Sequence, residues 1–421
     1  KRFEYAIQRF LSIEDAPFSG YLNVVEQVEA RDPYGDLCTS YTQTNCLTLW
    51  LRFKEPAAYV HTLMAMSMFY PAKAEKISAG GANWWAKPAN HVGNGPFNLS
   101  TFNAGGISTL LPNKYYRGGV PTYRMEYHYY EDEGEALNAY RADNLDMVGF
   151  MAYQVEEVKS DPKLNAEKRL DNGSRTMAIM FNQSKEPFQD PQIRKAFSLA
   201  TDRETLIDEV FGGSENVNLS WIAPGFPGYD GEYTQWGYNS SAADQAITAS
   251  SYGDPASVPP ITVTYPQNPL NDSMWEWLKT HWEDELGVTI HLDPVDPGAF
   301  YELLDNGSAM MFMNGWTADN PDPQNWISLP WRNDGVFAQR THYSNPAFDA
   351  LLAQADGDPN PVSRLQKYQT AQRMLIDDMP LMPIYNRTNK FLVKPWVQGV
   401  LPAALDYTWA GELVPLAVSI K

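Results

Sequence analysis

AMMFMNGWTADNPDPQNW, the stretch from Ala309 to Trp326, decides the fold of this chain. It begins with an almost wholly apolar run that reaches Trp316, and it then breaks into a loop that carries Asp319, Asp322 and two prolines. A short apolar run bounded by turn residues is typical of a strand buried on both faces of a parallel sheet. Ligands of open α/β sheets bind just beyond the carboxyl ends of such strands. The stretch therefore predicts a ligand site at this loop, with cationic groups as its natural ligands.

The length and composition of the chain indicate a folded protein of two or three domains. Its 421 residues exceed one ordinary core, and its apolar fraction of 43% and charged fraction of 20% are typical of globular chains. The net charge of −19 argues against nucleic acid as a partner, because phosphate binding needs clustered Lys and Arg. The simplest interpretation of the acidity is a solvated surface. No apolar run approaches the ~18 residues of a membrane span.

The later part of the chain has the pattern of an α/β protein. The predicted strands are Thr176–Phe181, Ile261–Tyr265, Val288–Leu292 and Ala309–Trp316. The predicted helices start at Asp190-Pro191, at a capping box Thr201–Glu204 and at a capping box of Ser273 and Glu276 that opens a helix to Leu286, and a last helix spans about Val362–Met379. A strand, a helix and a strand in succession over residues 261–292 predict a parallel βαβ unit.

The earlier part of the chain mixes helices and strands. Helical spacing of apolar residues predicts a helix at Phe3–Leu11, and a further helix is expected from about Ala58 to Tyr70. Alternating apolar residues predict strands at Leu47–Phe53 and at Tyr123–Tyr130, the second with one wetter face.

No motif of the sequence supports catalysis. Four acids cluster at positions 131–135, and paired carboxylates can cleave glycosides, but acids are ordinary at the start of a helix. The six histidines never fall at metal-ligand spacing, and no G-x-S-x-G nucleophile motif is present. Pro96 follows Gly93-Asn94-Gly95 where a phosphate-binding loop would begin its helix. The sequence therefore predicts no catalytic residue, no metal site and no cofactor.

Cys38 and Cys46 are the only two cysteines, and they flank the polar segment TSYTQTN. Neither a CxxC motif nor a pair of histidines accompanies them, so a metal site is not indicated. In an exported protein we expect them to close a small hairpin as a disulfide.

Six segments together resemble one family, the family 5 extracellular solute-binding proteins, which are the peptide- and nickel-binding receptors of ABC importers. The segments are NWW (Asn83–Trp85) with HVGNGPFNL (His91–Leu99), FNQSKEPFQDPQIRKAFSLATDRETL (Phe181–Leu206), GWTADNPDPQNW (Gly315–Trp326), YSNPAFDALLAQA (Tyr343–Ala355), MPLMPIYN (Met379–Asn386) and LVKPWVQGV (Leu392–Val400). They cover nearly the whole chain in the order of the family, which makes the set far more specific than any one motif.

The resemblance implies an α/β, two-lobed fold like that of periplasmic binding proteins, of class II type, with a small extra domain and a hinge between the lobes. Residues 1–79 would belong to the extra domain, 80–185 with 395–421 to a discontinuous first lobe, and 186–394 to the second, closing lobe. The lipoprotein signal and the opening strands of the family have no match in this sequence. We therefore expect a longer protein whose N-terminal portion is lacking here.

The resemblance also implies a ligand site at the loop after Trp316. In peptide-binding relatives the acid of a W-x-x-D motif pairs with the N-terminal ammonium of the ligand, and Asp319 matches that acid. Main-chain groups of Trp316, Thr317 and Ala318 would pair with the peptide as an added strand. The alternative for Asp319 is a turn-forming role, because Asp-Asn-Pro is ordinary turn chemistry.

Further ligand candidates follow from position alone. Asn182 ends a predicted strand, and its alternative role is to cap or turn the chain. Trp221 would line a ligand pocket, and the equal alternative is that its ring packs in the hydrophobic core. Asn94 is the third candidate. Arg194 and Arg203 lie in the helix motif of the family, and we expect both to be structural.

The function implied by the resemblance is that of a monomeric extracytoplasmic receptor, in the periplasm or lipid-anchored at the outer face of the cell membrane. It would capture oligopeptides or dipeptides in an interlobe cleft and deliver them to an ABC permease in the membrane. An oligosaccharide receptor of the same family is the alternative, which 13 Trp and 24 Tyr residues would suit. A glycosidase-type enzyme is a third and weaker alternative.

Overall fold

The structure is a computed structural model that describes residues 1–13, 19–400 and 418–420. Contacts between residues divide the described chain into two compact units. Unit 1 comprises Lys1–Val148 with residues 393–400 and 418–420, and unit 2 comprises Gly149–Leu392. This division groups residues 149–185 with unit 2 and does not separate residues 1–79 from the rest of unit 1. The division into an extra domain and two lobes stays a prediction.

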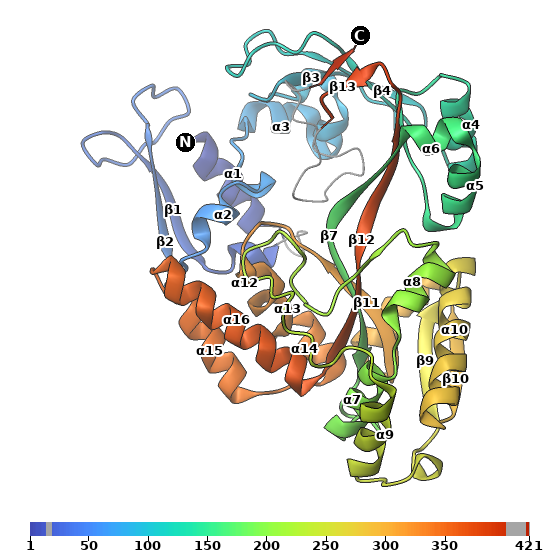
Figure 1. The fold of residues 1–421 in the computed structure, drawn as a ribbon. Coiled ribbons are helices and arrows are strands. Elements are labelled where there is room, and N and C mark those ends of the chain that lie inside the picture. Colours follow the sequence, from blue (N-terminus) through green and yellow to red (C-terminus); the bar gives the residue numbers. More distant parts are fainter. Residues whose placement is uncertain (14–18, 401–417, 421) are drawn as a thin grey trace. The chain divides into compact units, whose positions relative to one another are not determined.

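The described residues of unit 2 are built on a mixed sheet of seven strands, in the order β10-β9-β11-β7-β12-β6, with β8 paired to β12 (Figure 1). The division assigns the first two residues of β6 and the last residue of β12 to unit 1. The strands are β6 (Met147–Gly149), β7 (Lys168–Phe181), β8 (Asn216–Val217), β9 (Ile261–Pro266), β10 (Ile290–Val295), β11 (Met311–Thr317) and β12 (Leu381–Val393). Its helices are α5 (Val155–Ser160), α6 (Pro162–Glu167), α7 (Pro191–Leu199), α8 (Arg203–Phe211), α9 (Ser240–Ala249), α10 (Pro269–Leu286), α11 (Pro297–Asp305), α12 (Pro323–Trp326), α13 (Ser328–Trp331), α14 (Val336–Thr341), α15 (Pro346–Asp356) and α16 (Pro361–Asp378).

The direction predicted for β11 is wrong. The strand pairs antiparallel with β7 over its whole length, from Met311 opposite Phe181 to Thr317 opposite Arg175. It pairs parallel with β9 only where Met311 meets Val263. The apolar run predicted burial, and burial on both faces does not depend on the direction of the neighbouring strand. Antiparallel strands are therefore compatible with the same run when helices cover both faces.

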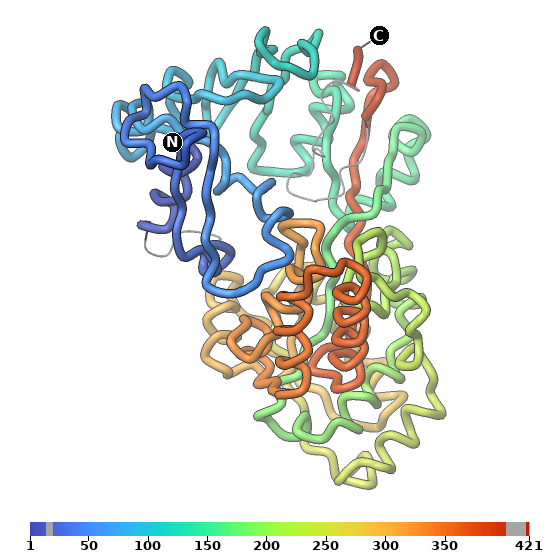
Figure 2. The backbone as a smooth tube through the Cα atoms, turned by 90° about the vertical axis from the view of Figure 1, so that its left-hand side faces the viewer, coloured from blue at the N-terminus to red at the C-terminus, as the bar shows by residue number. Residues whose placement is uncertain are grey.

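Burial on both faces of the sheet is confirmed by the packing of β7. Ile179 and Phe181 belong to one hydrophobic cluster, whereas Ala178 and Met180 belong to another. Successive side chains of a strand point to opposite faces, so the two clusters lie on opposite faces of the sheet. Helices α15 and α16 contribute to the second cluster and run beside one another (Figure 2).

The predicted βαβ unit is confirmed, because β9 and β10 pair parallel on either side of α10 in the sequence. Its helix ends as predicted at Gly287, which adopts a left-handed conformation with φ of 65°. The helix begins earlier than predicted, since the side chain of Asn268 caps it by accepting from the amide of Asn271. Asn followed by Pro is a strong helix start, and it places Ser273 inside the first turns instead of at the cap.

The predicted start of α8 is displaced by one residue. The side chain of Asp202, not Thr201, accepts from the amide of Thr205 and caps the helix. Thr201 is buried, and its hydroxyl donates to the carbonyl of Phe197 at 2.6 Å. A carboxylate is the stronger acceptor for the free amides of a helix start, which explains the shift.

In its described residues, unit 1 contains one three-stranded antiparallel sheet and two two-stranded sheets. Its elements are α1 (Arg2–Leu11), β1 (Val25–Arg31), β2 (Thr48–Phe53), α2 (Val60–Leu63), α3 (Ala74–Gly80), β3 (Phe97–Thr101), β4 (Ile107–Pro112), β5 (Met125–His128), α4 (Glu133–Arg141), β13 (Val397–Gln398) and β14 (Ser419–Ile420). The predicted helix from Ala58 to Tyr70 is wrong in extent. Only α2 and a short 3-10 turn at Ser67–Phe69 form, because Met66 between them is extended.

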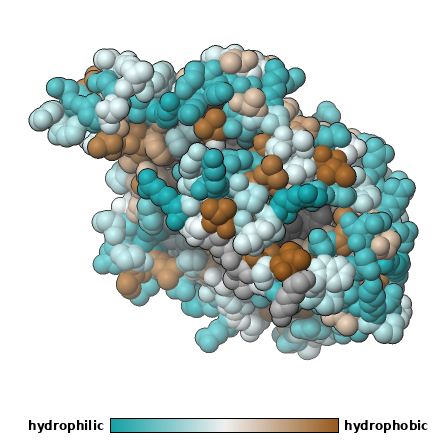
Figure 3. All heavy atoms as spheres, turned by 90° about the horizontal axis from the view of Figure 1, so that it is seen from above, coloured by the Kyte–Doolittle hydropathy of each residue, from teal (hydrophilic) through white to brown (hydrophobic). Residues whose placement is uncertain are grey.

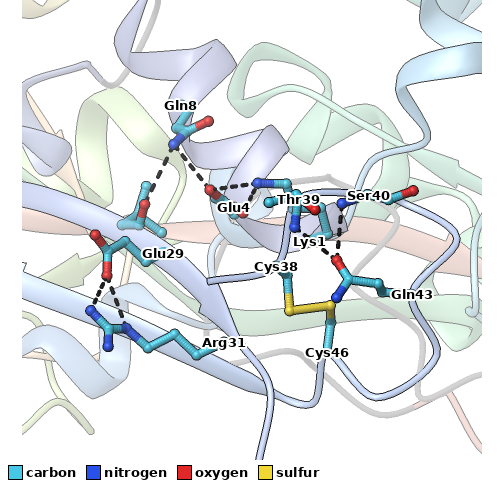
Figure 4. Close-up of polar contacts among 11 residues, drawn as sticks. Lys1, Glu4, Gln8, Glu29, Arg31, Cys38, Thr39, Ser40, Gln43 and Cys46 are labelled. Atoms are coloured by element: carbon cyan, nitrogen blue, oxygen red, sulfur yellow. Dashed lines mark hydrogen bonds and ion pairs between the residues drawn. A yellow bond between two sulfur atoms is a disulfide. The ribbon is translucent and has the colours of Figure 1, made fainter. Parts of the chain in front are cut away.

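The structure joins Cys38 and Cys46 in a disulfide that follows the hairpin strand β1 (Figure 4). Within the loop that the disulfide closes, the side-chain oxygen of Gln43 accepts from the amides of Thr39 at 2.7 Å and Ser40 at 3.0 Å. These bonds satisfy main-chain groups that no sheet partner would otherwise satisfy.

On the face drawn in Figure 3, hydrophobic residues are scattered among hydrophilic ones. Among the described residues, no helix has both the length and the apolar character needed to cross a membrane.

Two buried arginines of unit 2 donate to main-chain carbonyls, Arg203 of α8 to strand β12 and Arg194 of α7 to the end of α16, as the sequence predicts for structural residues. Arg203 donates to the carbonyls of Pro383 at 2.7 Å and Ser198 at 3.1 Å. Arg194 donates to the carbonyls of Met379 and Phe188 at 2.9 Å and 2.6 Å. Burial lowers the pKa of Arg203 to about 10, which leaves the guanidinium charged at neutral pH.

Replacement of Arg203 by lysine is expected to lower the free energy of unfolding by about 3 kcal/mol, because an ammonium cannot reproduce the planar set of donors and leaves buried carbonyls unpaired. Urea-induced unfolding followed by circular dichroism measures the loss. The control is Arg387→Lys, at an exposed position of β12. An Arg203→Lys variant as stable as that control would contradict the structural role.

Candidate functional site

The loop after β11 is tied to the sheet at its first residues. The amide of Ala318 donates to the carbonyl of Ser174, just before the segment of β7 that pairs with β11, at 3.4 Å. Ala318 is fully buried, whereas Thr317 and Asp319 on either side of it are partly exposed. The chain therefore leaves the sheet with one buried residue between two accessible ones.

Asn325 connects the end of the strand to the helix that follows the loop. Its side-chain oxygen accepts two hydrogen bonds of 3.0 Å, one from the indole nitrogen of Trp316 and one from the amide of Asp319. Asn325 has no exposed surface, and it lies in the short helix α12. One buried oxygen thus fixes both an aromatic ring and the main chain that carries the acid.

A buried ion pair holds the start of α12. The carboxylate of Asp322 accepts from both terminal nitrogens of Arg364 in α16, at 2.6 and 2.9 Å, and it also accepts from the amide of Gln324 at 2.9 Å. Burial alone would lower the pKa of Arg364, but its hydrogen bonds with Asp322 and the nearby tyrosine Tyr368 raise it above the ordinary value. Asp322 is therefore a structural acid of the loop.

The accessible part of the site consists of Trp316 and Asp319. Both side chains are partly exposed, and the Trp316 ring lies edge-on to Phe337 with 5.6 Å between ring centroids. The site thus presents an apolar ring and a carboxylate within three residues of each other. A carboxylate offers acceptors to an ammonium or guanidinium group, and a Trp ring offers an apolar wall.

Near the site, the edge of β11 that faces β9 forms no strand ladder among the described residues. Beyond Met311 the strand pairs with β7 alone among the described residues. In an antiparallel ladder, alternate residues turn their main-chain groups away from the partner strand. Main-chain groups between Met313 and Thr317 on this edge are thus without a strand partner in the described part of the chain.

Asn182 lies at the other end of β11, about 20 Å from Asp319 by the rise of the strand. Antiparallel pairing brings the carboxyl end of β7 to the amino end of β11, so the two residues do not meet. The amide of Asn182 donates to the carbonyls of Gly307 at 3.2 Å and Ala309 at 2.9 Å, and its oxygen accepts from the hydroxyl of Ser184 at 2.7 Å. These bonds turn the chain at the end of β7.

Trp221 lies in the core beneath the loop. It has no exposed surface, its indole nitrogen donates to the carbonyl of Trp326 at 2.6 Å, and its ring lies edge-on to those of Trp326 and Trp331. Asn94 is exposed and belongs to unit 1. Of the predicted residues, the structure brings together Trp316, Thr317, Ala318 and Asp319. Ligand roles for Asn182, Trp221 and Asn94 stay predictions.

Sequence reasoning missed Asn325 and Arg364. Asn325 stands in the stretch that decided the fold, but an Asn in a loop gives no signal of which donors it will accept from. Arg364 is 42 residues from Asp322, and no periodicity relates the two.

Replacement of Asp322 by Asn is expected to lower the free energy of unfolding by about 3–5 kcal/mol, because it leaves a buried guanidinium without its counter-charge. The matched control is Asp305→Asn, which breaks an ion pair with Arg340 whose acid is 60% exposed. That change is expected to cost less than about 1 kcal/mol. Equal losses for the two variants in urea unfolding would show that Asp322→Asn leaves no uncompensated buried charge, and would contradict the prediction.

The sequence matches a family model described as bacterial extracellular solute-binding proteins, family 5 middle, over residues 1–337. It is 25% identical over 411 residues to the periplasmic oligopeptide-binding protein OppA of Salmonella typhimurium, covering 94% of this chain and 75% of that protein. It is 26% identical over 412 residues to YgiS of Escherichia coli, a probable deoxycholate-binding periplasmic protein, with the same two coverages of 94% and 75%.

The structure is similar to the unliganded open form of MppA, a periplasmic murein tripeptide-binding protein. The TM-score is 0.79 at 21% identity, and the match covers 100% of this chain and 82% of that one. The predicted α/β fold like that of periplasmic binding proteins is thereby confirmed.

Proposed function

The chain belongs to the bacterial extracellular solute-binding proteins of family 5, substrate-binding proteins of ABC transport and not enzymes, and we propose that this member captures oligopeptides or dipeptides. Its place would be extracytoplasmic, as for its periplasmic relatives, and it would deliver the peptide to a membrane permease. The observation that carries the proposal is a partly exposed acid, Asp319, directly after a strand that has no ladder partner on the β9 side beyond Met311 among the described residues.

The carboxylate of Asp319 would receive the N-terminal ammonium of the peptide. Hydrogen bonds between an ammonium and a carboxylate are about twice as strong as neutral ones, and they strengthen further when water is excluded. The main chain of Asp319 is already fixed by Asn325, so little conformational freedom is lost when the ligand binds. The partly exposed ring of Trp316 would cover the first residue of the peptide.

The edge of β11 that faces β9 would receive the peptide main chain. An extended peptide that adds a strand to a sheet edge is held by main-chain hydrogen bonds, which are the same for every side chain. Recognition by the main-chain groups of Trp316, Thr317 and Ala318 that do not pair with β7 would then give affinity with little preference for sequence. The ammonium at Asp319 would set the register of the peptide against the strand.

The two other candidate ligands lack one of these features. A neutral oligosaccharide would use the Trp316 ring but has no cation for Asp319, and a bile acid such as deoxycholate carries a carboxylate that Asp319 would repel. Deoxycholate is considered because one relative is a probable deoxycholate-binding protein, and the oligosaccharide because the chain is rich in Trp and Tyr. They are therefore outcomes of the test below.

Replacement of Asp319 by Asn is expected to weaken binding of free-amine peptides by about 2–5 kcal/mol, because the ammonium loses its charged partner in the site. Binding of the same peptides with an acetylated N-terminus, already weak, is expected to change little. Isothermal titration calorimetry with trialanine and N-acetyl-trialanine measures both effects.

The control for the lost charge is Asp334→Asn, whose side chain is 72% exposed. It is expected to bind both peptides as the unaltered protein does. If Asp319→Asn weakens binding of both peptides equally, Asp319 does not bind the N-terminal ammonium. Tight binding of a neutral sugar or of deoxycholate, with no peptide binding, would overturn the peptide assignment as a whole.

A further inference from the structure

We infer that Asn325 is a positioning residue of the ligand site: its amide oxygen holds the Trp316 ring and the Asp319 main chain in the one arrangement that receives an ammonium. Asn325 would thereby set the preference of the protein for ligands with a free amino terminus without touching the ligand. This inference rests on the proposed function. The experiment below has one outcome that contradicts the role of Asn325 alone and another that contradicts both.

The chemistry of the two hydrogen bonds fixes which atom of Asn325 faces the site. An indole N–H and a main-chain N–H can only donate, so the group between Trp316 and Asp319 must be an acceptor. The side-chain oxygen of Asn325 fulfils that role for both at 3.0 Å, and its nitrogen cannot replace it. Two groups that a ligand would contact therefore depend on one buried atom.

Asn325 is itself held in place by charged residues outside the site. The main-chain N–H of Asn325 donates to the main-chain carbonyl of Asp322 at 3.0 Å. The side chain of Asp322 is in turn fixed by the two hydrogen bonds from Arg364. A chain of hydrogen bonds thus connects Arg364 in α16 to Asp322, Asp322 to Asn325, and Asn325 to the Trp316 ring and the Asp319 main chain. The complete burial of Asn325 excludes direct contact between its side chain and a ligand in this arrangement.

The inference predicts an effect on specificity and not only on stability. Without the acceptor, the indole N–H of Trp316 and the amide of Asp319 lose their shared partner, and the carboxylate is no longer presented in one position. A free-amine peptide would lose the contact that distinguishes it from its acetylated form. A residue that merely stabilised the fold would weaken binding of both peptides equally.

The test compares Asn325→Leu, which has a similar volume and no acceptor, with Asn325→Asp, which keeps acceptor oxygens at the same place. Calorimetry with trialanine and N-acetyl-trialanine gives the ratio of the two affinities. We expect Asn325→Leu to reduce this ratio about tenfold and Asn325→Asp to retain it. Should Asn325→Leu fail to fold, Asn325→Ser serves instead, because its short hydroxyl cannot reach both donors.

A double variant separates action through Asp319 from an independent effect. In the Asp319→Asn background, Asn325→Leu is expected to change the affinity ratio no further, since residues that act through one contact are not additive. An unchanged ratio in the single Asn325→Leu variant, or a further tenfold loss in the double variant, would overturn the inference while leaving the peptide assignment intact. An unaltered protein that does not distinguish the two peptides would overturn both.

Discussion

The antiparallel ladder between β11 and β7 is the constraint on which the rest of unit 2 depends. In this ladder the carboxyl end of β11 lies beside Ser174 and Arg175 of β7, and the acidic loop begins there. On its other side, β7 pairs with β12. The ladder also requires a glycine at position 315, because a Cβ atom there would lie 2.8 Å from the carbonyl oxygen of Thr176. The register of β11 is thus fixed by the sheet itself, independently of the loop contacts.

The loop contacts hold the acidic segment after β11 in one arrangement. A buried carboxylate paired with Arg364 holds the start of α12, and the amide oxygen of Asn325 carries that order to Trp316 and Asp319. The charged pair is costly to desolvate, so its value lies more in the geometry that it enforces than in net stability. Asp319 is the partly exposed acid of this arrangement, and Asp322 is the buried one.

Sequence reasoning predicted the elements that depend on local pattern. The βαβ unit with α10, the helix that Asp190 caps, and the strand from Met311 to Thr317 follow from periodicity and capping. The direction of β11 could not be predicted, because an apolar run reports burial alone. Antiparallel pairing puts two of the predicted ligand residues, Asn182 and Asp319, at opposite ends of a strand. The partners Asn325 and Arg364 could not be predicted either, since they depend on the path of the loop and on a helix far along the sequence.

The central claim is that Asp319 and the edge of β11 that faces β9 receive the amino terminus and main chain of a peptide. A crystal structure of the protein with bound trialanine tests it most directly. The account predicts the ammonium nitrogen within about 3 Å of an Asp319 carboxylate oxygen, with main-chain hydrogen bonds between the peptide and residues 316–318. A bound peptide whose amino terminus lies away from Asp319, or which pairs with no main-chain group of that segment, would contradict it.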